Sequence, residues 1–168
     1  MTYSIEHKYT LDVGAGHRKR YAQYFTPQCI ARFMNNWVLG GESGRSIFDP
    51  AFGLGAFAEN VSDDVFFSGM EVDARIIDCF KSNFPASKAV VEIDNYLLKY
   101  GEFHENIVCN PPYLKFQKFE QKETVLEQFE KRYGIQLSGY TNIASAFLVK
   151  SIFELQPGGR LAYIMPES

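Results

Sequence analysis

The stretch Asn110-Pro111-Pro112-Tyr113 carries the residue types best suited to chemistry in this chain. It follows an apolar run that predicts the end of a buried strand. Two consecutive prolines make a rigid corner without a free N–H, so they fix the Asn110 side chain and the Pro111 carbonyl as neighbouring acceptors. Two such acceptors suit an –NH₂ group, because hydrogen bonds to both protons of a base amine free its lone pair for attack. Tyr113 then offers a flat face on which that base can stack. A proline-rich surface turn is the alternative, and the position at a strand end disfavours it.

A second unusual stretch, FDPAFGLGAF at 48–57, places an acid and two glycines in one turn. Gly53 and Gly55 allow the backbone to approach a ligand closely and to adopt positive φ. A phosphate cradle is one interpretation. Against it, no Lys-Ser/Thr follows as a P-loop requires, and Ala58 stands where the third glycine of a dinucleotide motif would fall. Asp49 at the start of the turn suits a ligand with an ammonium group better than one with a phosphate.

Acids also end the next two predicted strands. Glu71 lies near the distance from the glycine turn, roughly 20 residues, at which an acid typically accepts hydrogen bonds from ribose hydroxyls. Asp94 ends the third strand, where it is placed to accept from the exocyclic amine of adenine. Each acid taken alone is better explained as a solvated loop residue or a helix cap. Together, at consecutive strand ends, they predict a site for an adenosine ligand without phosphates.

The elements that must position these residues alternate between strands and helices. Apolar runs predict strands at 45–49, 64–72, 88–94 and 106–110, and a fifth strand after 157–159. Helical spacing predicts a first helix capped by Thr26 with Pro27 at its first position, and further helices from about Ala56 and over 74–84, 124–133 and 142–155. This alternation predicts an α/β fold: a mostly parallel sheet with helices on both faces, whose ligands bind at the carboxyl ends of the strands.

The spacing of the first predicted helix also assigns its inward face. The apolar residues at i, i+3, i+4, i+7 and i+8 are Ile30, Phe33, Met34, Trp37 and Val38. After the prolines, Lys115, Lys118 and Lys122 alternate with Phe116 and Phe119. This segment is equally compatible with a phosphate-binding loop that closes over a base and with an amphipathic cover on the sheet.

Composition narrows the class of protein. A chain of 168 residues with 46% hydrophobic and 22% charged residues is one globular domain. Its net charge of −3 gives no general attraction for polyanions, so phosphate-binding charge must lie in a local patch or outside this chain. No apolar run approaches the roughly 20 residues that span a bilayer, and no secretion signal opens the chain, so we expect a cytoplasmic protein without membrane contact. Cys29, Cys79 and Cys109 are predicted to be buried reduced thiols, and no metal site is expected.

The two ends of the chain carry further expectations. Residues 1–20 are polar and end in the basic cluster 17–20, which predicts a flexible N-terminal arm ahead of a catalytic domain over 21–168. The chain stops just after the fifth strand. We therefore expect a domain that is truncated at its C-terminal side.

The ordered set of motifs resembles the S-adenosylmethionine-dependent amino-DNA methyltransferases of bacterial restriction–modification systems. The order is that of the gamma group, in which cofactor motifs precede the catalytic motif and a target-recognition domain comes last. The matching stretches are YFTP (24–27), DPAFGLGAF (49–57), GMEVD (69–73), EID (92–94), NPPY (110–113) and LQPGGRLAYIMPES (155–168). NPPY alone is shared with other methyltransferases, whereas the whole set with YFTP in front is far more specific. The resemblance implies a Rossmann-like methyltransferase fold.

The resemblance also implies a role for each matching residue. The residues implied to bind S-adenosylmethionine are Tyr24 and Thr26 on the methionine side, Asp49, Ala51, Gly53 and Gly55 in the methionine pocket, Glu71 and Val72 at the ribose and pocket wall, Asp94 and Asn95 at the adenine, and Asn110. Those implied to position and activate the target adenine are Asn110, Pro111, Pro112 and Tyr113. The family often has Phe after the third acid, where this chain has Asn95 followed by Tyr96. Tyr96 or another apolar residue is expected to substitute for that Phe.

The implied reaction is direct methyl transfer from S-adenosylmethionine to adenine N6 of double-stranded DNA, as the modification activity of a restriction–modification system. The adenine would be flipped out of the duplex, at a cost of a few kcal/mol of unstacking. A target-recognition domain or specificity subunit outside this chain would select the sequence. The alternatives are an RNA adenine methyltransferase, a protein-glutamine methyltransferase, which YFTP after a short arm disfavours, and a non-catalytic fragment of a larger modification protein.

Overall fold

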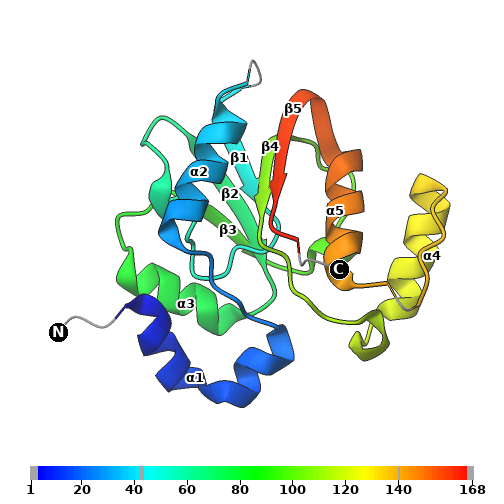
Figure 1. The fold of residues 1–168 in the computed structure, drawn as a ribbon, viewed down its shortest axis with the longest axis horizontal. Helices are drawn as coiled ribbons and strands as arrows, with labels where there is room; N and C mark the ends of the chain where they lie inside the picture. Colours follow the sequence, from blue (N-terminus) through cyan, green and yellow to red (C-terminus); the bar gives the residue numbers. More distant parts are fainter. Residues whose placement is uncertain (1–3, 42–43, 140, 166–168) are drawn as a thin grey trace.

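A computed structural model describes residues 4–41, 44–139 and 141–165 of the chain. Helices and strands alternate along most of its length (Figure 1). The elements are α1 (Ile5–Tyr21), α2 (Gln28–Leu39), β1 (Ser46–Asp49), β2 (Phe66–Glu71), α3 (Ala74–Asn83), β3 (Val90–Ile93), β4 (His104–Cys109), α4 (Lys122–Tyr133), α5 (Ile143–Glu154) and β5 (Leu155–Tyr163). The five strands and the helices after β2 lie within a few residues of their predicted positions.

The five strands form one sheet in the order β3-β2-β1-β4-β5, and every neighbouring pair is parallel. The chain therefore builds outward from β1 to β3 on one side and then returns to place β4 and β5 on the other. The boundary between β1 and β4 is the switch point of the sheet, where ligands of such folds bind. The predicted α/β fold with a parallel sheet is confirmed.

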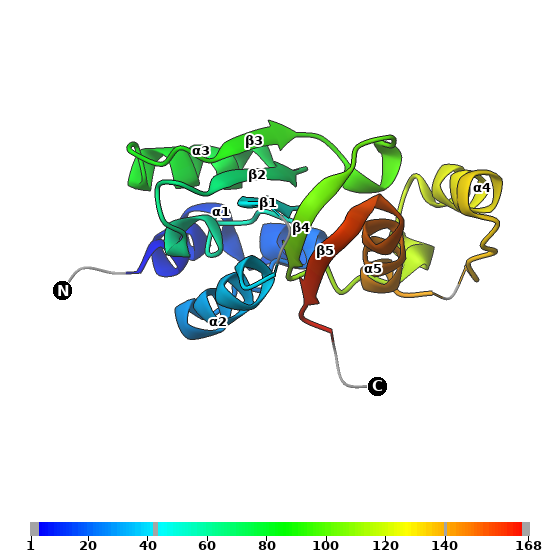
Figure 2. The same cartoon turned by 90° about the horizontal axis from the view of Figure 1, so that it is seen from above.

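Alternate residues of the strands enter two separate hydrophobic clusters. On β1, Ile47 packs into a cluster with α1, α2 and α3, whereas Phe48 packs into a second cluster with α4 and α5. On β4, Val108 and Cys109 divide in the same way. Successive side chains of a strand point to opposite faces, so helices cover both faces of the sheet. Figure 2 shows α2 beside β4 and β5, with α5 on the far side of β5.

The prediction of a flexible N-terminal arm is wrong for the described residues. Residues 5–21 form α1, which is capped at its start by Ser4 and interrupted at Gly14, where φ is +74°. Tyr9 is 1% exposed and belongs to the same cluster as α2 and α3. The polar composition of this segment hid its structure, because its anchoring depends on hydrogen bonds to a distant part of the chain rather than on an apolar face.

The inward face of α2 is also corrected. Met34 and Val38 are buried as predicted, but the side chains of Ile30, Phe33 and Trp37 are 41%, 68% and 47% exposed. The buried face includes Ala31 and Asn35 instead, and the Asn35 amide donates a hydrogen bond to the Phe57 carbonyl at 2.8 Å. This buried hydrogen bond fixes the rotation of α2 about its axis, so the face that packs on the sheet differs from the face predicted from the apolar residues.

Three smaller expectations change as well. No α-helix begins at Ala56: only a 3₁₀ turn forms over 58–60, and the backbone is already extended at Val61. Of the free cysteines, Cys109 is buried as predicted, Cys79 is half-buried and Cys29 is exposed. Among the described helices, none combines the length and the apolarity needed to cross a bilayer. Residues 166–168 of the last matching stretch lie outside the described part of the chain.

A charged pair is buried under the α5 face of the sheet. Lys150 and Glu154, one turn apart on α5, are 1% and 4% exposed and form an ion pair. The Lys150 ammonium also lies 3.9 Å from the centre of the Tyr96 ring. Burial lowers the pKa of Lys150 to about 8, against the opposing effect of Glu154. Each charge is therefore tolerated mainly because the other is present.

We predict that Glu154→Gln destabilises the protein by roughly 3–5 kcal/mol, because it leaves the Lys150 ammonium buried without a counter-charge. The double variant Lys150→Met/Glu154→Leu should regain most of this loss, since it removes both charges. Urea unfolding of the three proteins measures the difference. A Glu154→Gln variant as stable as the wild type would show that the pair is unimportant for folding.

Candidate functional site

The ends of four parallel strands bring the predicted chemistry together. Asp49 is the last residue of β1 and Glu71 the last of β2, while Asp94 and Asn110 directly follow β3 and β4. Because all strands are parallel, these ends meet at one edge of the sheet, on both sides of the switch point. The sequence prediction of a site at this edge therefore corresponds to residues that lie close together.

Asp49 is fully buried and only half satisfied. Its Oδ1 accepts a hydrogen bond from the Ala51 N–H at 3.0 Å. Its Oδ2 is buried and has no hydrogen-bond partner among the described residues. Burial, with a smaller contribution from the nearby Glu71, raises the pKa of Asp49 to about 8 against the opposing hydrogen bond from the Ala51 N–H. An unpaired carboxylate oxygen of this kind would be stabilised by a cationic donor, such as an ammonium group.

Glu71 joins the glycine turn to the second strand. Its two oxygens accept backbone hydrogen bonds from Gly53 at 3.0 Å, Val72 at 2.9 Å and Asp73 at 3.0 Å. The pKa of Glu71 is raised by burial, and these three N–H groups oppose the rise. Since a carboxylate offers about four acceptor sites, one remains for a ligand hydroxyl. The positive φ of Gly53, +57°, allows this approach of the turn to Glu71.

Asn110 is held in one orientation by the segment before α2. Its Nδ2 donates to the Tyr24 carbonyl at 3.0 Å and to Thr26 Oγ1 at 3.1 Å. Both amide protons are therefore engaged, and Oδ1 is the group left to act as acceptor. Tyr113 donates its hydroxyl to this Oδ1 at 2.8 Å and lies near the Ile164 carbonyl at 3.0 Å.

Thr26 does not act as the predicted N-cap of α2. The α2 helix begins at Gln28 with Pro27 as its N-cap, and no side chain caps it. Thr26 is 5% exposed and uses its hydroxyl oxygen to fix Asn110. The sequence could not reveal this bond, because it joins residues that are 84 positions apart.

These residues line three neighbouring pockets that share lining residues and are together called the central cavity. The pocket at Asp49 and Thr26 has a volume of about 50 Å³, and the middle pocket at Gly53, Glu71 and Asn110 about 80 Å³. The third pocket, of about 300 Å³, is lined by Val72, Asn95, Pro112, Phe119 and Phe147. An elongated ligand with a charged end, a polar middle and a flat apolar end fits this sequence of walls.

Several predicted residues contribute differently from expectation. The Asp94 side chain is exposed and accepts from the N–H of Asn95 at 2.7 Å, without lining the central cavity. Gly55 is buried and does not line the cavity. A Cβ at this position would lie 2.4 Å from the Phe80 ring, so Gly55 allows close packing in the core. Tyr96 contributes to the middle wall, but its hydroxyl bonds to Ser151 inside the core.

Ala51 lines the central cavity, whereas Pro111 is buried beside it without lining it. Sequence reasoning missed Phe119 and Phe147 as walls. Phe119 belongs to the lysine-bearing segment, whose Phe116 is fully buried and whose Lys115 is exposed. This segment therefore packs as a cover beside the third pocket. Phe147 carried no sequence signal beyond the apolar pattern of α5.

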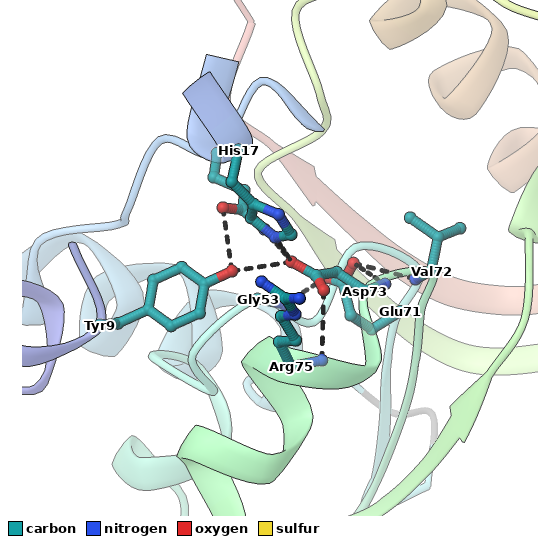
Figure 3. Close-up of polar contacts among 8 residues, drawn as sticks. Tyr9, His17, Gly53, Glu71, Val72, Asp73 and Arg75 are labelled. Atoms are coloured by element: carbon teal, nitrogen blue, oxygen red, sulfur yellow. Dashed lines mark hydrogen bonds and ion pairs between the residues drawn. The ribbon is translucent and has the colours of Figure 1, made fainter. Parts of the chain in front are cut away.

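The C-terminal end of α1 forms the remaining wall of the cavity and is fixed by Asp73 (Figure 3). Asp73 Oδ2 accepts from the Tyr9 hydroxyl at 2.7 Å and the Gln23 amide at 2.7 Å, and it lies 2.6 Å from His17 Nε2. Burial raises the pKa of Asp73, but the hydrogen bonds from His17, Tyr9 and Gln23 outweigh it and leave the pKa lowered. This Asp73 cluster holds Tyr21 and Tyr24 in place over the cavity.

Comparison with known proteins identifies the class and then the family. The fold is that of the methyltransferase subunit of a type I restriction–modification system from Streptococcus thermophilus, with a TM-score of 0.65 at 17% identity, covering 86% of this chain and 34% of that one. The family model described as Eco57I restriction-modification methylase matches residues 59–168 of this chain. The chain belongs to the Eco57I restriction-modification methylase family.

Curated relatives agree with this family. The chain is 36% identical to the type II methyltransferase M.AccI of Acinetobacter calcoaceticus over 97% of its own length and 31% of the relative. It is 27% identical to the type II methyltransferase M.HincII of Haemophilus influenzae over 86% of its own length and 28% of the relative. The chain thus spans about a third of the length of the relatives it matches. The predicted resemblance is confirmed.

The raised pKa of Asp49 predicts a pH dependence of stability. Between the ordinary pKa of Asp, near 4, and about 8, the folded state binds a proton that the unfolded state releases. The contribution of this proton to stability is therefore complete at low pH and is lost as the pH rises toward 8. Asp49→Asn should remove this dependence and be more stable than the wild type at pH 8.

Urea unfolding at pH 5 and pH 8 without ligand measures this effect. Asp94→Asn is the matched control, because it changes an exposed acid at a neighbouring strand end. Its difference from the wild type should be equal at both pH values. A difference between wild type and Asp49→Asn that does not change with pH would contradict the prediction.

Proposed function

We propose that this chain is the catalytic part of a DNA methyltransferase that transfers a methyl group from S-adenosylmethionine to N6 of adenine. The single observation that carries the proposal is the position of Asn110. Its Oδ1 is left as an acceptor where the central cavity meets the surface beside Tyr113. Family membership favours DNA over RNA or protein as the substrate.

The residues of the central cavity fit S-adenosylmethionine. The unpaired Oδ2 of Asp49 would bind the methionine ammonium, and the remaining acceptor site of Glu71 a ribose hydroxyl. Val72, Pro112 and Phe147 would enclose the adenine. When bound, the cofactor supplies a methyl group on a positively charged sulfur, which is a good leaving group.

Asn110 and its neighbours would activate the target amine. Asn110 Oδ1 and the Pro111 carbonyl would accept the two amine protons, so the nitrogen lone pair is freed to form the bond to the methyl carbon. Tyr113 occupies only one of the two lone pairs of Asn110 Oδ1, so the second is available. The methylated amine would then release one proton to solvent water, which completes the transfer. Positioning of the amine supplies most of the catalysis.

A covalent enzyme intermediate is not part of this mechanism. Cys109, next to the motif, is fully buried on the α5 side of the sheet, and burial raises the pKa of its thiol well above the usual value. A buried, protonated thiol is a poor nucleophile. The amine of the substrate is therefore the attacking group.

We predict that the wild-type chain binds S-adenosylmethionine in a calorimetric titration. Asp49→Asn and Glu71→Gln should each weaken binding at least about tenfold, because each removes a carboxyl group that would bind the cofactor in the cavity. Asp78→Asn, an exposed acid on α3, is the control and should bind as the wild type does. A folded wild-type chain that does not bind the cofactor would contradict this assignment of the cavity.

We predict a separate effect on methyl transfer. In a form of the protein that transfers labelled methyl groups to unmethylated DNA, Asn110→Ala should lower kcat at least about 100-fold, because it removes an acceptor for the target amine. Thr26→Val should lower kcat less, about tenfold, because Asn110 keeps the Tyr24 carbonyl as a partner. Thr26→Ser should restore most of the rate.

Asn36→Ala, an exposed residue of α2, serves as the control for these variants. Nucleoside analysis of the product distinguishes N6-methyladenine from other methylated bases. Transfer to RNA or protein but not to DNA would overturn the proposed substrate. An Asn110→Ala enzyme as active as the wild type would overturn the proposed mechanism.

A further inference from the structure

A second hollow, the α1 groove, adjoins the central cavity on its outer side. It has a volume of about 630 Å³ and lies between the C-terminal half of α1 and the motif that follows β4. Residues that carry chemistry on its walls are Arg18, Lys19, Arg20, Tyr24 and Tyr113. The groove therefore ends at the place where the target base would enter.

The charge of the groove is of one sign. None of its lining residues is acidic. Arg18 is engaged inside α1, where it donates to Thr10 Oγ1 and the Gln23 carbonyl. Lys19 and Arg20 are exposed, and neither forms an ion pair with another described residue. The Arg20 guanidinium lies over the Tyr21 ring, 5.7 Å from its centre. In a chain of net charge −3, two exposed cations without a carboxylate partner on one wall are a local attraction for an anion.

The inner end of the groove is aromatic. Tyr24 is 66% exposed, and the centre of its ring lies 5.9 Å from that of Tyr113. The backbone of Tyr24 is held in place, because its carbonyl accepts from Asn110. A cationic wall that leads to aromatic rings is the combination with which proteins bind a single nucleic-acid strand: the cations follow the phosphates and the rings pack against bases.

The groove is preformed rather than assembled by the ligand. The Asp73 cluster binds α1 through Tyr9, His17 and Gln23 (Figure 3). Asp73 also donates its backbone N–H to Glu71 of the central cavity. The wall that carries Lys19 and Arg20 is therefore fixed relative to the cavity, so cations and cavity face a strand at a constant distance.

We propose that α1 guides the DNA strand that carries the target adenine. Lys19 and Arg20 bind phosphates beside the flipped nucleotide, and the Tyr24 ring packs against the extruded base beside Tyr113. This inference rests on the proposed function and adds to it the part of this chain that holds the DNA backbone.

The test measures binding of a fluorescent duplex whose central adenine lies opposite an abasic site and is therefore easily extruded. Lys19→Gln/Arg20→Gln should weaken binding at least about tenfold at low salt. It should also reduce the slope of log K against log salt by about 1.8, the value for two lost phosphate contacts. The control Lys8→Gln/Lys81→Gln removes the same charge from exposed positions outside the groove. It should stay within about twofold of the wild type.

Tyr24→Ala separates base packing from charge. It should weaken binding of the abasic duplex about fivefold, with little change for a fully paired duplex and an unchanged salt slope. Equal binding by wild type and Lys19→Gln/Arg20→Gln would overturn the inference. So would equal losses in the groove variant and the control, equally effective competition by poly-glutamate, or a wild-type chain that binds no DNA at 20 mM salt, a low ionic strength chosen because it favours phosphate contacts.

Titration with S-adenosylmethionine distinguishes this inference from the proposed function. Lys19→Gln alone should retain the wild-type cofactor affinity, because Lys19 does not line the central cavity. A chain that binds the duplex through Lys19 and Arg20 but does not bind the cofactor would support the groove and contradict the proposed function. A chain that binds the cofactor but not the duplex would support the cofactor site and contradict the groove.

Discussion

The burial of Asp49 at the end of the central strand is the constraint on which the site depends. β1 is paired on both edges, with β2 and β4, and packed on both faces, so its last side chain cannot reach bulk water. A carboxyl group in this position is unfavourable while one oxygen lacks a partner. The surrounding packing holds the group there. In the proposed function, the ammonium group of the cofactor would remove this cost, which is a common relation between stability and function.

The turn that follows β2 connects the parts of the site mechanically. Glu71 accepts a hydrogen bond from Gly53 of the glycine turn, and Asp73, two residues later, accepts one from Tyr9 of α1. From the end of α1 the chain runs through Tyr24 to Thr26, and both bind Asn110. Hydrogen bonds and short stretches of covalent chain together therefore connect the acid of the second strand to the amide after the fourth.

Contacts on the α5 side of the sheet show what Asn95 does in place of the Phe that the family often has at this position. The side chain of Asn95 caps a 3₁₀ turn by accepting from the Leu97 N–H and donates to Gln121 on the covering segment. Tyr96 points into the core, where it bonds to Ser151 above the buried Lys150. Tyr96 thus supports the cavity wall from within rather than closing it from outside, and Phe147 and Phe119 supply the apolar surface there.

The sequence by itself determined which polar residue ends each of the first four strands and that two rigid prolines follow the fourth. The residues at these strand ends are Asp49, Glu71, Asp94 and Asn110. These features are local, since burial pattern and proline geometry act within a few residues. Only the tertiary structure decided that the polar N-terminal segment is a helix, that Thr26 orients Asn110, and that Lys19 and Arg20 line one groove with Tyr113. Each of these depends on contacts between distant residues, such as Tyr9 with Asp73. No local pattern encodes such contacts, because their geometry exists only after the sheet has assembled.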